Sequence, residues 1–278
     1  MKGTRKPIIK AGSRVSAVGL ERYNMCYFKI IIPNYNNEKW LDKCLSSVFN
    51  QTFQDFKVIV IDDCSTDKSV EIIKKYPVKL ITNKHRVYNG GARNLGIRYK
   101  VKSKYTFFLD SDDWLSEPSA LQRVHDRLEN NPVDCLTIAY KLYYGEGDEG
   151  IVTMDRNTRK RLVWDDNGAC WTKVIKTELI REFPEGTLME DTVQHIEQCN
   201  YLNTFDSLPI AIITYNRANT DSLTNPKKHQ SIKWQTSVFR YIADLKELFC
   251  PDEECEARRK HTLAIKIDEV KKGVWGEW

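Results

Sequence analysis

The sequence lacks the patterns of several large protein classes. It has no run of eighteen or more apolar residues, and its first 25 residues contain no uninterrupted apolar segment like that of a secretory signal peptide. The one GxGxxG match, GEGDEG at residues 145–150, lies in an acidic stretch typical of a loop, whereas the first apolar run is followed by PNYNN, and GxxxxGKS/T does not occur. These patterns argue against dinucleotide oxidoreductases and P-loop enzymes. We therefore expect a cytoplasmic protein with no transmembrane segment.

Cysteine pairs of the kind that hold zinc are also missing. The eight cysteines are scattered without a CxxC pair, and several lie in apolar runs, so reduced core thiols are the favoured interpretation. Cys250 and Cys255 are close in sequence, but no second ligand pair lies nearby with the spacing of a zinc site. We expect no structural zinc.

The charge is concentrated at one end of the chain. The 278 residues carry a net charge of +5 and are 41% hydrophobic, enough for a full core in one large domain with an appendage. Residues 1–25 hold six basic residues against Glu21 alone, which accounts for the excess. Such an arm can bind the phosphates of nucleic acid or of a membrane surface, although a solvated segment is the more usual outcome.

From Tyr27 onward, short apolar runs alternate with helical periodicity, which is typical of βαβ units and a parallel sheet. We predict that Pro33 ends the first strand, that residues 145–168 form a mobile loop, and that two amphipathic helices lie between His229 and Lys272. The other expected strands and helices are strands 28–32, 57–61, 78–82, 105–109, 134–144 and 210–215, and helices near 40–49, 65–76, 90–97, 117–128 and 191–202.

Polar residues follow three of these strands. Asn34-Tyr35 follow the first, Asp62-Asp63 the second, and Asp110 to Asp113 the fourth. Ligands of open α/β sheets bind at the carboxyl ends of the strands, where loops and helix N-termini converge. One ligand could therefore touch all three groups.

Asp110, Asp112 and Asp113 place three carboxylates within four residues. Their repulsion favours a bound hard cation such as Mg²⁺ or Mn²⁺, while a solvated turn that caps the next helix is the alternative. Asp62-Asp63 and Glu190-Asp191 also have a simpler explanation, since acidic residues before a helix favour its positive end.

The order of these segments resembles the family 2 glycosyltransferases, which have the GT-A fold. The resemblance covers residues 28 to about 224 and rests on five segments: IIIPNYNNEKWLDKCLSSVFNQTFQDFKVIVIDDCSTDKS, NGGARNLGI, YTFFLDSDDW, WTKVIKTELI with FPEGTLMEDT, and YNRANTDSLT. It implies an α/β fold with a Rossmann-like, mostly parallel sheet flanked by helices and a helical C-terminal appendage. The implied domains are an arm at 1–26, a GT-A domain at 27–226 with a nucleotide-sugar half (27–115) and an acceptor half (116–226), and an extension at 227–278.

The resemblance also implies the roles of the site residues. Asp191 corresponds to the family's catalytic base, with Glu190 orienting it, in an inverting single displacement. Trp171 and Lys173 lie in a segment like the acceptor wall, although a core position is as good an interpretation of Trp171. A Mn²⁺ or Mg²⁺ ion would be held by Asp110, Asp112 and Asp113. The expected contacts of a UDP-sugar donor are Pro33, Tyr35, Asp62, Asp63, Arg93, Asn94, Asp110, Ser111, Arg217 and Ser222.

The sequence does not identify the acceptor molecule. A glycan or glycoconjugate is the expected acceptor, and the C-terminal helices could support a homo-oligomer. The alternatives are a hydroxymethyl-type modified base in DNA and a non-catalytic nucleotide-sugar-binding module. The DNA hypothesis rests on the basic arm and on a second basic cluster, Arg156, Arg159, Lys160 and Arg161. Some related enzymes supply a histidine to the metal, and His195 and His229 are the candidates near the match.

Overall fold

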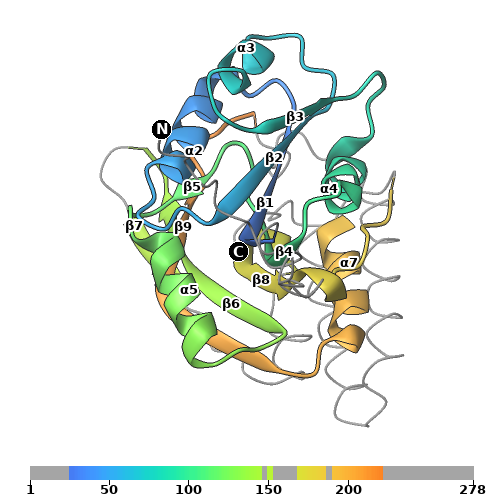
Figure 1. Cartoon of the computed structure of the whole chain (residues 1–278). Helices are drawn as coiled ribbons and strands as arrows, with labels where there is room; N and C mark the ends of the chain where they lie inside the picture. Colours follow the sequence, from blue (N-terminus) through green and yellow to red (C-terminus); the bar gives the residue numbers. More distant parts are fainter. Residues whose placement is uncertain (1–24, 146–148, 153–167, 186–189, 222–278) are drawn as a thin grey trace, which may run out of the picture.

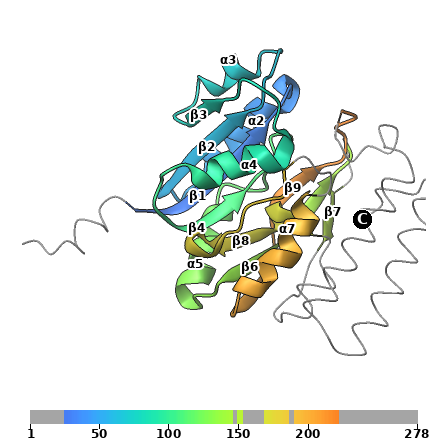
Figure 2. The ribbon, with the colours of Figure 1, turned by 90° about the vertical axis from the view of Figure 1, so that its right-hand side faces the viewer.

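The computed structural model describes residues 25–145, 149–152, 168–185 and 190–221 (Figure 1). One mixed sheet runs through these residues, with the strand order β3-β2-β1-β4-β8-β6-β9-β5, and β7 pairs with β6 beside this path. Helices α2 and α5 cover one face of the sheet, while α4 and α7 cover the other (Figures 1 and 2). The α/β class predicted from the alternating pattern is confirmed.

The first half of the sheet is parallel, as predicted. Buried isoleucines fill the central strands on both faces, which is what a sheet covered by helices on both sides requires. The elements of this half are β1 (Cys26–Asn34), α2 (Glu38–Phe49), β2 (Phe56–Asp62), α3 (Ser69–Ile73), β3 (Lys79–Thr82), α4 (Tyr88–Arg98) and β4 (Ser103–Phe108).

The second half adds antiparallel pairings: β8 pairs with β4 and β6, and β5 pairs with β9. The sequence pattern did not predict β5 or β8. The elements are β5 (Trp114–Leu115), α5 (Ala120–Asn130), β6 (Cys135–Tyr143), β7 (Glu149–Val152), η1 (Cys170–Thr172), β8 (Lys173–Lys176), η2 (Thr177–Leu179), α7 (Glu190–Gln198), η3 (Cys199–Tyr201) and β9 (Phe205–Asn216).

The strand order reverses between β1 and β4. The chain moves outward from β1 to β2 and β3, and then returns to place β4 on the other side of β1. The loops after β1 and β4 therefore leave the sheet in opposite directions, and a crevice opens between them at the carboxyl ends of the strands. This topology positions the candidate site.

The prediction that Pro33 ends the first strand is wrong, because β1 continues to Asn34. The Ile31 carbonyl faces β4 and accepts from the Leu109 N–H, whereas the Asn34 carbonyl faces β2 and accepts from the Asp63 N–H. Pro33 faces the same side as Ile31, beyond the last residue that β1 pairs with β4. Its missing N–H therefore breaks no ladder bond.

Part of the segment predicted as a mobile loop is a strand. Residues 149–152 form β7 and pair with Tyr140 to Tyr143 of β6. The expected helix at 191–202 ends at Gln198 and continues as a 3₁₀ turn, and the expected strand at 210–215 extends over Phe205–Asn216. The sequence did not predict the first part of this strand, because Pro209 interrupts the apolar pattern at the point where β9 bulges away from β6.

Several sequence-based expectations lie outside the described residues: the basic arm, Arg156 to Arg161, Ser222, His229, and the C-terminal helices. Among the residues that are described, no helix is both long enough and apolar enough to cross a membrane. The six described cysteines are all free thiols, as expected, and five of them are buried.

Gly90→Ala is expected to lower the free energy of unfolding by about 1 kcal/mol or more, despite the helix propensity that alanine gains. An added Cβ would lie 2.7 Å from the Pro184 carbonyl oxygen and 3.0 Å from Glu190 Cγ. Gly150→Ala is the matched control, because nothing lies within 4 Å of a Cβ at that position. Urea unfolding measures both variants, and equal stabilities would contradict the close packing of α4 against α7.

Candidate active site

Asp63 organises the loop that leads into α4. It is buried, and its carboxylate accepts from Asn83 Nδ2 at 2.9 Å, from Arg86 Nε at 3.0 Å, and from the backbone N–H groups of Val87 and Tyr88 at 2.9 Å each. The carboxylate therefore satisfies N–H donors at the start of α4 and fixes the loop from Asn83 to Tyr88 against the end of β2. Asp62 beside it is fully buried and accepts from Asn34 Nδ2 and the Ser65 N–H.

An exposed aromatic and cationic group lies at the mouth of this loop. The Arg86 guanidinium carbon is 3.3 Å from the centroid of the Tyr35 ring and 5.0 Å from that of Tyr88. Tyr35 is 42% exposed and Tyr88 is 55% exposed, so both rings offer a face to a ligand. Sequence reasoning missed Arg86. Its only signal was a basic run, residues 84–86, directly after the third strand.

Arg93 connects the end of β4 to the start of α7. Its guanidinium donates to Asp110 Oδ1 at 2.7 Å and to Glu190 Oε1 at 2.7 Å, and only 3% of the side chain is exposed. The sequence predicted that Arg93 contacts the donor. The structure places it beneath the surface, where it holds together two carboxylates 80 residues apart in the chain.

Asn94, the other residue of the ARN segment, binds protein backbone. Its Oδ1 accepts from the Phe183 N–H at 2.7 Å, and its Nδ2 donates to the Phe183 carbonyl at 2.9 Å and to Glu185 Oε1 at 3.0 Å. These bonds fix Phe183 and Glu185 to α4. Arg93 thus holds Glu190 directly, while Asn94 holds the chain at Phe183 and Glu185.

The carboxylates of the acidic cluster after β4 bind two parts of the chain, Arg93 of α4 and the segment from Asn216 to Asn219. Asp110 faces Arg93, whereas Asp112 Oδ2 accepts from Asn219 Nδ2 at 2.7 Å and Asp113 Oδ1 accepts from the Asn216 N–H at 2.8 Å. Burial and the charge of Asp110 raise the pKa of Asp112 to about 6. Burial and the charges of both neighbours raise the pKa of Asp113 well above its usual range.

These carboxylates suit a divalent cation that takes only some of its ligands from the protein. The described residues contain no group of three or more His, Cys, Asp or Glu side chains arranged to hold a metal alone. Asp110 Oδ2 and Asp112 Oδ1 lie outside the bonds given above, and the mutual repulsion of the carboxylates would be relieved by a cation. A site with one or two carboxylates, completed by phosphate oxygens, is the arrangement that Mg²⁺ prefers.

Asp191 has the perturbed acidity expected of a general base. It lies half-buried in the first turn of α7, beside Glu190. Burial and the charge of Glu190 raise the pKa of Asp191 to about 7, against the opposing effect of Arg93. A carboxylate with a pKa near neutral pH can accept a proton and release it again.

The remaining predicted site residues are placed differently. Pro33 is buried in β1, and the buried Ser111 hydroxyl accepts from Asn37 Nδ2 at 2.9 Å. Trp171 is 6% exposed and packs in the core against Tyr140 and Tyr215, which is the core position that the sequence left open.

Lys173 is 2% exposed and donates to the Ala169 carbonyl at 2.7 Å, inside the protein. Arg217 follows β9, and its N–H donates to the Tyr143 carbonyl at 2.7 Å. The Arg217 guanidinium lies 3.5 Å from the Tyr215 hydroxyl. His195 of α7 is buried, and its ring nitrogens lie 3.8 and 3.9 Å from the Cys199 sulfur of η3.

The sequence was compared with known families and proteins. The family described as glycosyl transferase family 2 matches residues 29–193. The poly(ribitol-phosphate) beta-N-acetylglucosaminyltransferase TarS of Staphylococcus aureus is 32% identical over 176 residues, which is 58% of this chain and 30% of TarS. The beta-1,3-glucosyltransferase WfgD of Escherichia coli, which acts on alpha-D-GlcNAc-diphosphoundecaprenol, is 29% identical over 55% of this chain and 62% of WfgD.

Solved structures share the fold. The crystal structure of residues 1–349 of S. aureus TarS with UDP-GlcNAc superposes with a TM-score of 0.70 at 24% identity, and covers 87% of this chain and 71% of that one. The mannosyltransferase PcManGT of Pyrobaculum calidifontis, solved with GDP-Man and Mn²⁺, superposes with a TM-score of 0.59 at 14% identity, and covers 90% and 74%. The match to full-length TarS spans less than a third of its length.

Arg93→Met is expected to lower the free energy of unfolding by about 3–5 kcal/mol, because it leaves the buried Glu190 and the partly buried Asp110 without their cation. Arg98→Gln on the same helix is the control. Its ion pairs with Glu182 and Glu185 are exposed, and their loss should cost no more than about 1 kcal/mol. Chemical denaturation measures both. Similar losses for the two variants would contradict the bridging role of Arg93.

Proposed function

Because the chain belongs to glycosyl transferase family 2, we propose that it transfers a sugar from a UDP-sugar to a hydroxyl group of a glycan or glycoconjugate. The observation that carries the proposal is the buried Arg93. It links the acidic cluster at the donor edge to the carboxylates that begin α7. A group able to hold a diphosphate and a group able to accept a proton thereby lie on opposite sides of one guanidinium.

The donor base lies, in this proposal, against the Tyr35 ring and the Arg86 guanidinium. Both are accessible at the end of the first two strands, and stacking on a planar base suits an aromatic ring with a cation beside it. Asp63 acts by holding Arg86 and the N-terminal turn of α4 in place. The choice of uracil is supported by the TarS structure, which contains UDP-GlcNAc.

In this proposal the donor diphosphate lies over Asp110 and Asp112, which would hold Mn²⁺ or Mg²⁺ through Asp110 Oδ2 and Asp112 Oδ1. Such an ion neutralises the charge on the leaving diphosphate. Asp113 has a different role, because its carboxylate accepts from the Asn216 N–H and so fixes the end of β9. Asp112 holds the following turn through Asn219.

Asp191 acts as the general base. The acceptor oxygen forms a bond to the anomeric carbon while the bond from that carbon to the diphosphate oxygen breaks, and the hydroxyl proton passes to Asp191. Glu190, held by Arg93, keeps α7 and its neighbour in position. One displacement at the anomeric carbon inverts its configuration.

The acceptor class follows from the relatives. TarS and a Bacillus spizizenii relative are named for poly(ribitol-phosphate), and WfgD for a lipid-linked GlcNAc. We therefore propose a glycoconjugate acceptor and a cytoplasmic reaction. No described contact favours modified DNA, and the residues that prompted this alternative lie outside the described ranges.

Hydrolysis of a panel of UDP-sugars with Mn²⁺ or Mg²⁺ tests the function. We expect metal-dependent release of UDP from one sugar, and at least a roughly tenfold loss of release in Asp112→Asn, which removes a charge from the metal site. Asp126→Asn is the control, because Asp126 is an exposed carboxylate on α5. Absence of both UDP release and metal-dependent UDP binding for every sugar would overturn the proposed donor.

The pH profile tests the base. Below its pKa of about 7, Asp191 is protonated and cannot accept the hydroxyl proton. We expect kcat/KM for the acceptor to fall as pH decreases through about 7, measured at saturating donor and metal, which keep the acidic cluster ionised. Asp191→Asn should lose transfer and retain UDP binding. A profile that stays flat from about pH 5.5 to about pH 8.5 would exclude Asp191 as the base.

A further inference from the structure

The Asp63 carboxylate has no free position at which to recognise a donor base. Its Oδ1 accepts from Asn83 Nδ2 and from the Val87 N–H, at 2.9 Å each. Its Oδ2 accepts from Arg86 Nε at 3.0 Å and from the Tyr88 N–H at 2.9 Å. A carboxylate offers about four lone-pair sites, and these bonds use them. The N3–H of a uracil ring therefore finds no acceptor on Asp63 while the loop keeps this conformation.

Arg86 is the polar group that stays available beside Asp63. Its Nε is bonded to Asp63, but neither Nη1 nor Nη2 donates to another of the described residues. The side chain is 33% exposed, and the ring of Tyr35 packs against its guanidinium. A guanidinium donates in a fixed, planar fork and has no acceptor. Arg86 therefore presents N–H groups, held in one orientation, to a carbonyl oxygen of a ligand.

Tyr88 completes this group at the cost of backbone strain. Its φ of 59° lies in the left-handed region, where a bulky side chain is rare. Its N–H is bonded to Asp63, and its ring is 55% exposed and 5.0 Å from the Arg86 guanidinium carbon. Strain of this kind persists only where surrounding bonds impose it, and it clusters at ligand sites. We call Tyr35, Arg86 and Tyr88 the base clamp.

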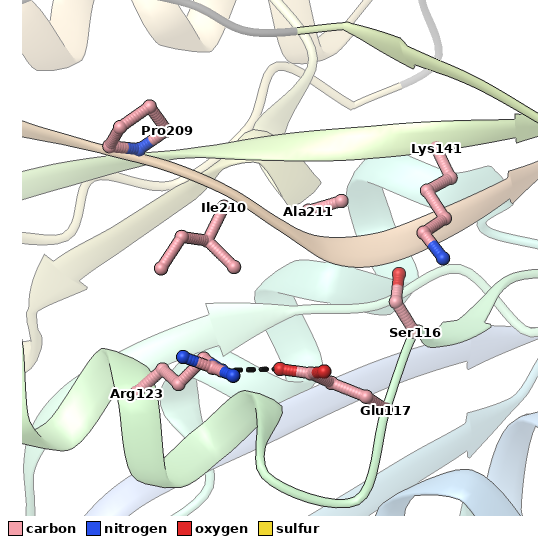
Figure 3. A pocket seen from close by; sticks show the side chains of 7 residues that line it. All are labelled: Ser116, Glu117, Arg123, Lys141, Pro209, Ile210 and Ala211. Carbon is pink, nitrogen blue, oxygen red and sulfur yellow. Dashed lines mark hydrogen bonds and ion pairs between the residues drawn. The ribbon is translucent and has the colours of Figure 1, made fainter.

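A cavity of about 360 Å³ beside α5 and β9 is the other place to consider for a base (Figure 3). Its wall of Pro209 and Ile210 is aliphatic, and its Arg123 is paired with Glu117 (Figure 3). Such a wall offers no aromatic face on which a base can stack. The base clamp has both an aromatic face and unused N–H donors, so it suits a base better than the cavity does.

We propose that the base clamp selects uracil: Arg86 donates to the O4 carbonyl of the ring, and Tyr88 stacks on the ring beside Tyr35. Cytosine has an amino group in place of O4, and this donor would meet the N–H groups of the guanidinium. A site built to hydrogen-bond one group rejects an analogue that lacks it. The assignment rests on the proposed function and adds which residues choose the base.

Calorimetric titration of the full chain with UDP, CDP and GDP, each with Mn²⁺, tests the role of Arg86. UDP should bind at least roughly tenfold more tightly than CDP. Arg86→Met should raise Kd for UDP about fivefold or more and bring the Kd values of UDP and CDP within about twofold of each other. If Arg86 served only the charge of the diphosphate, both nucleotides would weaken equally, and an unchanged ratio would overturn the assignment.

Tyr88→Gly tests the stacking role separately. Glycine adopts a positive φ without strain, so thermal unfolding should occur at the same temperature or a higher one. Every base has a face that stacks, so Kd for UDP and for CDP should rise together, each about fivefold or more. Unchanged Kd values in a folded Tyr88→Gly protein would overturn the stacking role.

Arg181→Met is the matched control. The Arg181 guanidinium carbon also lies over an exposed tyrosine, 3.6 Å from the centroid of the Tyr201 ring. The neighbouring Glu182 pairs with Arg98, which is the last residue of α4, whereas Tyr88 is the first. Both Kd values should equal those of the unmodified protein. A loss as large as that of the clamp variants would overturn the assignment.

UDP release by the unmodified protein is measured in parallel. Release together with a preference for UDP over CDP that survives Arg86→Met refutes the base clamp and leaves the glycosyltransferase proposal standing. Absence of both UDP release and metal-dependent binding of any nucleotide refutes the proposed function on which the assignment rests. Guanine also offers acceptors to a guanidinium, so tighter binding of GDP than of UDP would refute uracil as the selected base.

Discussion

The ion pairs of Arg93 are the interaction on which the site depends. A guanidinium that is almost fully buried requires compensating charge, and Asp110 and Glu190 supply it from elements far apart in the chain. With Asp191 included, three carboxylates surround one cation. This excess of negative charge, together with burial, keeps Asp191 protonated up to about pH 7. The same bridge thus fixes the position of the base and sets its acidity.

The sheet topology explains why such a bridge can exist. The reversal of strand order between β1 and β4 brings the ends of these strands to one edge, and α4 crosses beneath that edge with Gly90 close to Pro184 and Glu190. The antiparallel strands of the second half return the chain so that α7 packs against α4, on the face that carries Arg93 (Figure 2).

Local sequence patterns predicted most strands of the sheet and the edge at which the candidate site lies. Apolar runs bounded by turn residues revealed β1, β2, β3, β4 and β6, and the carboxylates after β2 and β4 were recognised as one edge. Long-range partners could not be derived in this way. The sequence gives no sign that Arg93 faces Glu190, that Asn94 binds the Phe183 backbone, or that Lys173 is buried, because each depends on how α4 and the second half pack. Arg86 was missed since a basic residue in a loop has no periodic signature.

The central claim is that Arg93 holds one reaction centre together. A crystal structure of the full chain with UDP and Mn²⁺ tests it most directly. The account predicts uracil against Tyr35 and Arg86, the metal on Asp110 or Asp112, and Arg93 still bonded to both Asp110 and Glu190 while Asp191 faces the open side of the diphosphate. A nucleotide bound away from this edge, or an Arg93 side chain released from Glu190 toward the phosphates, would contradict it.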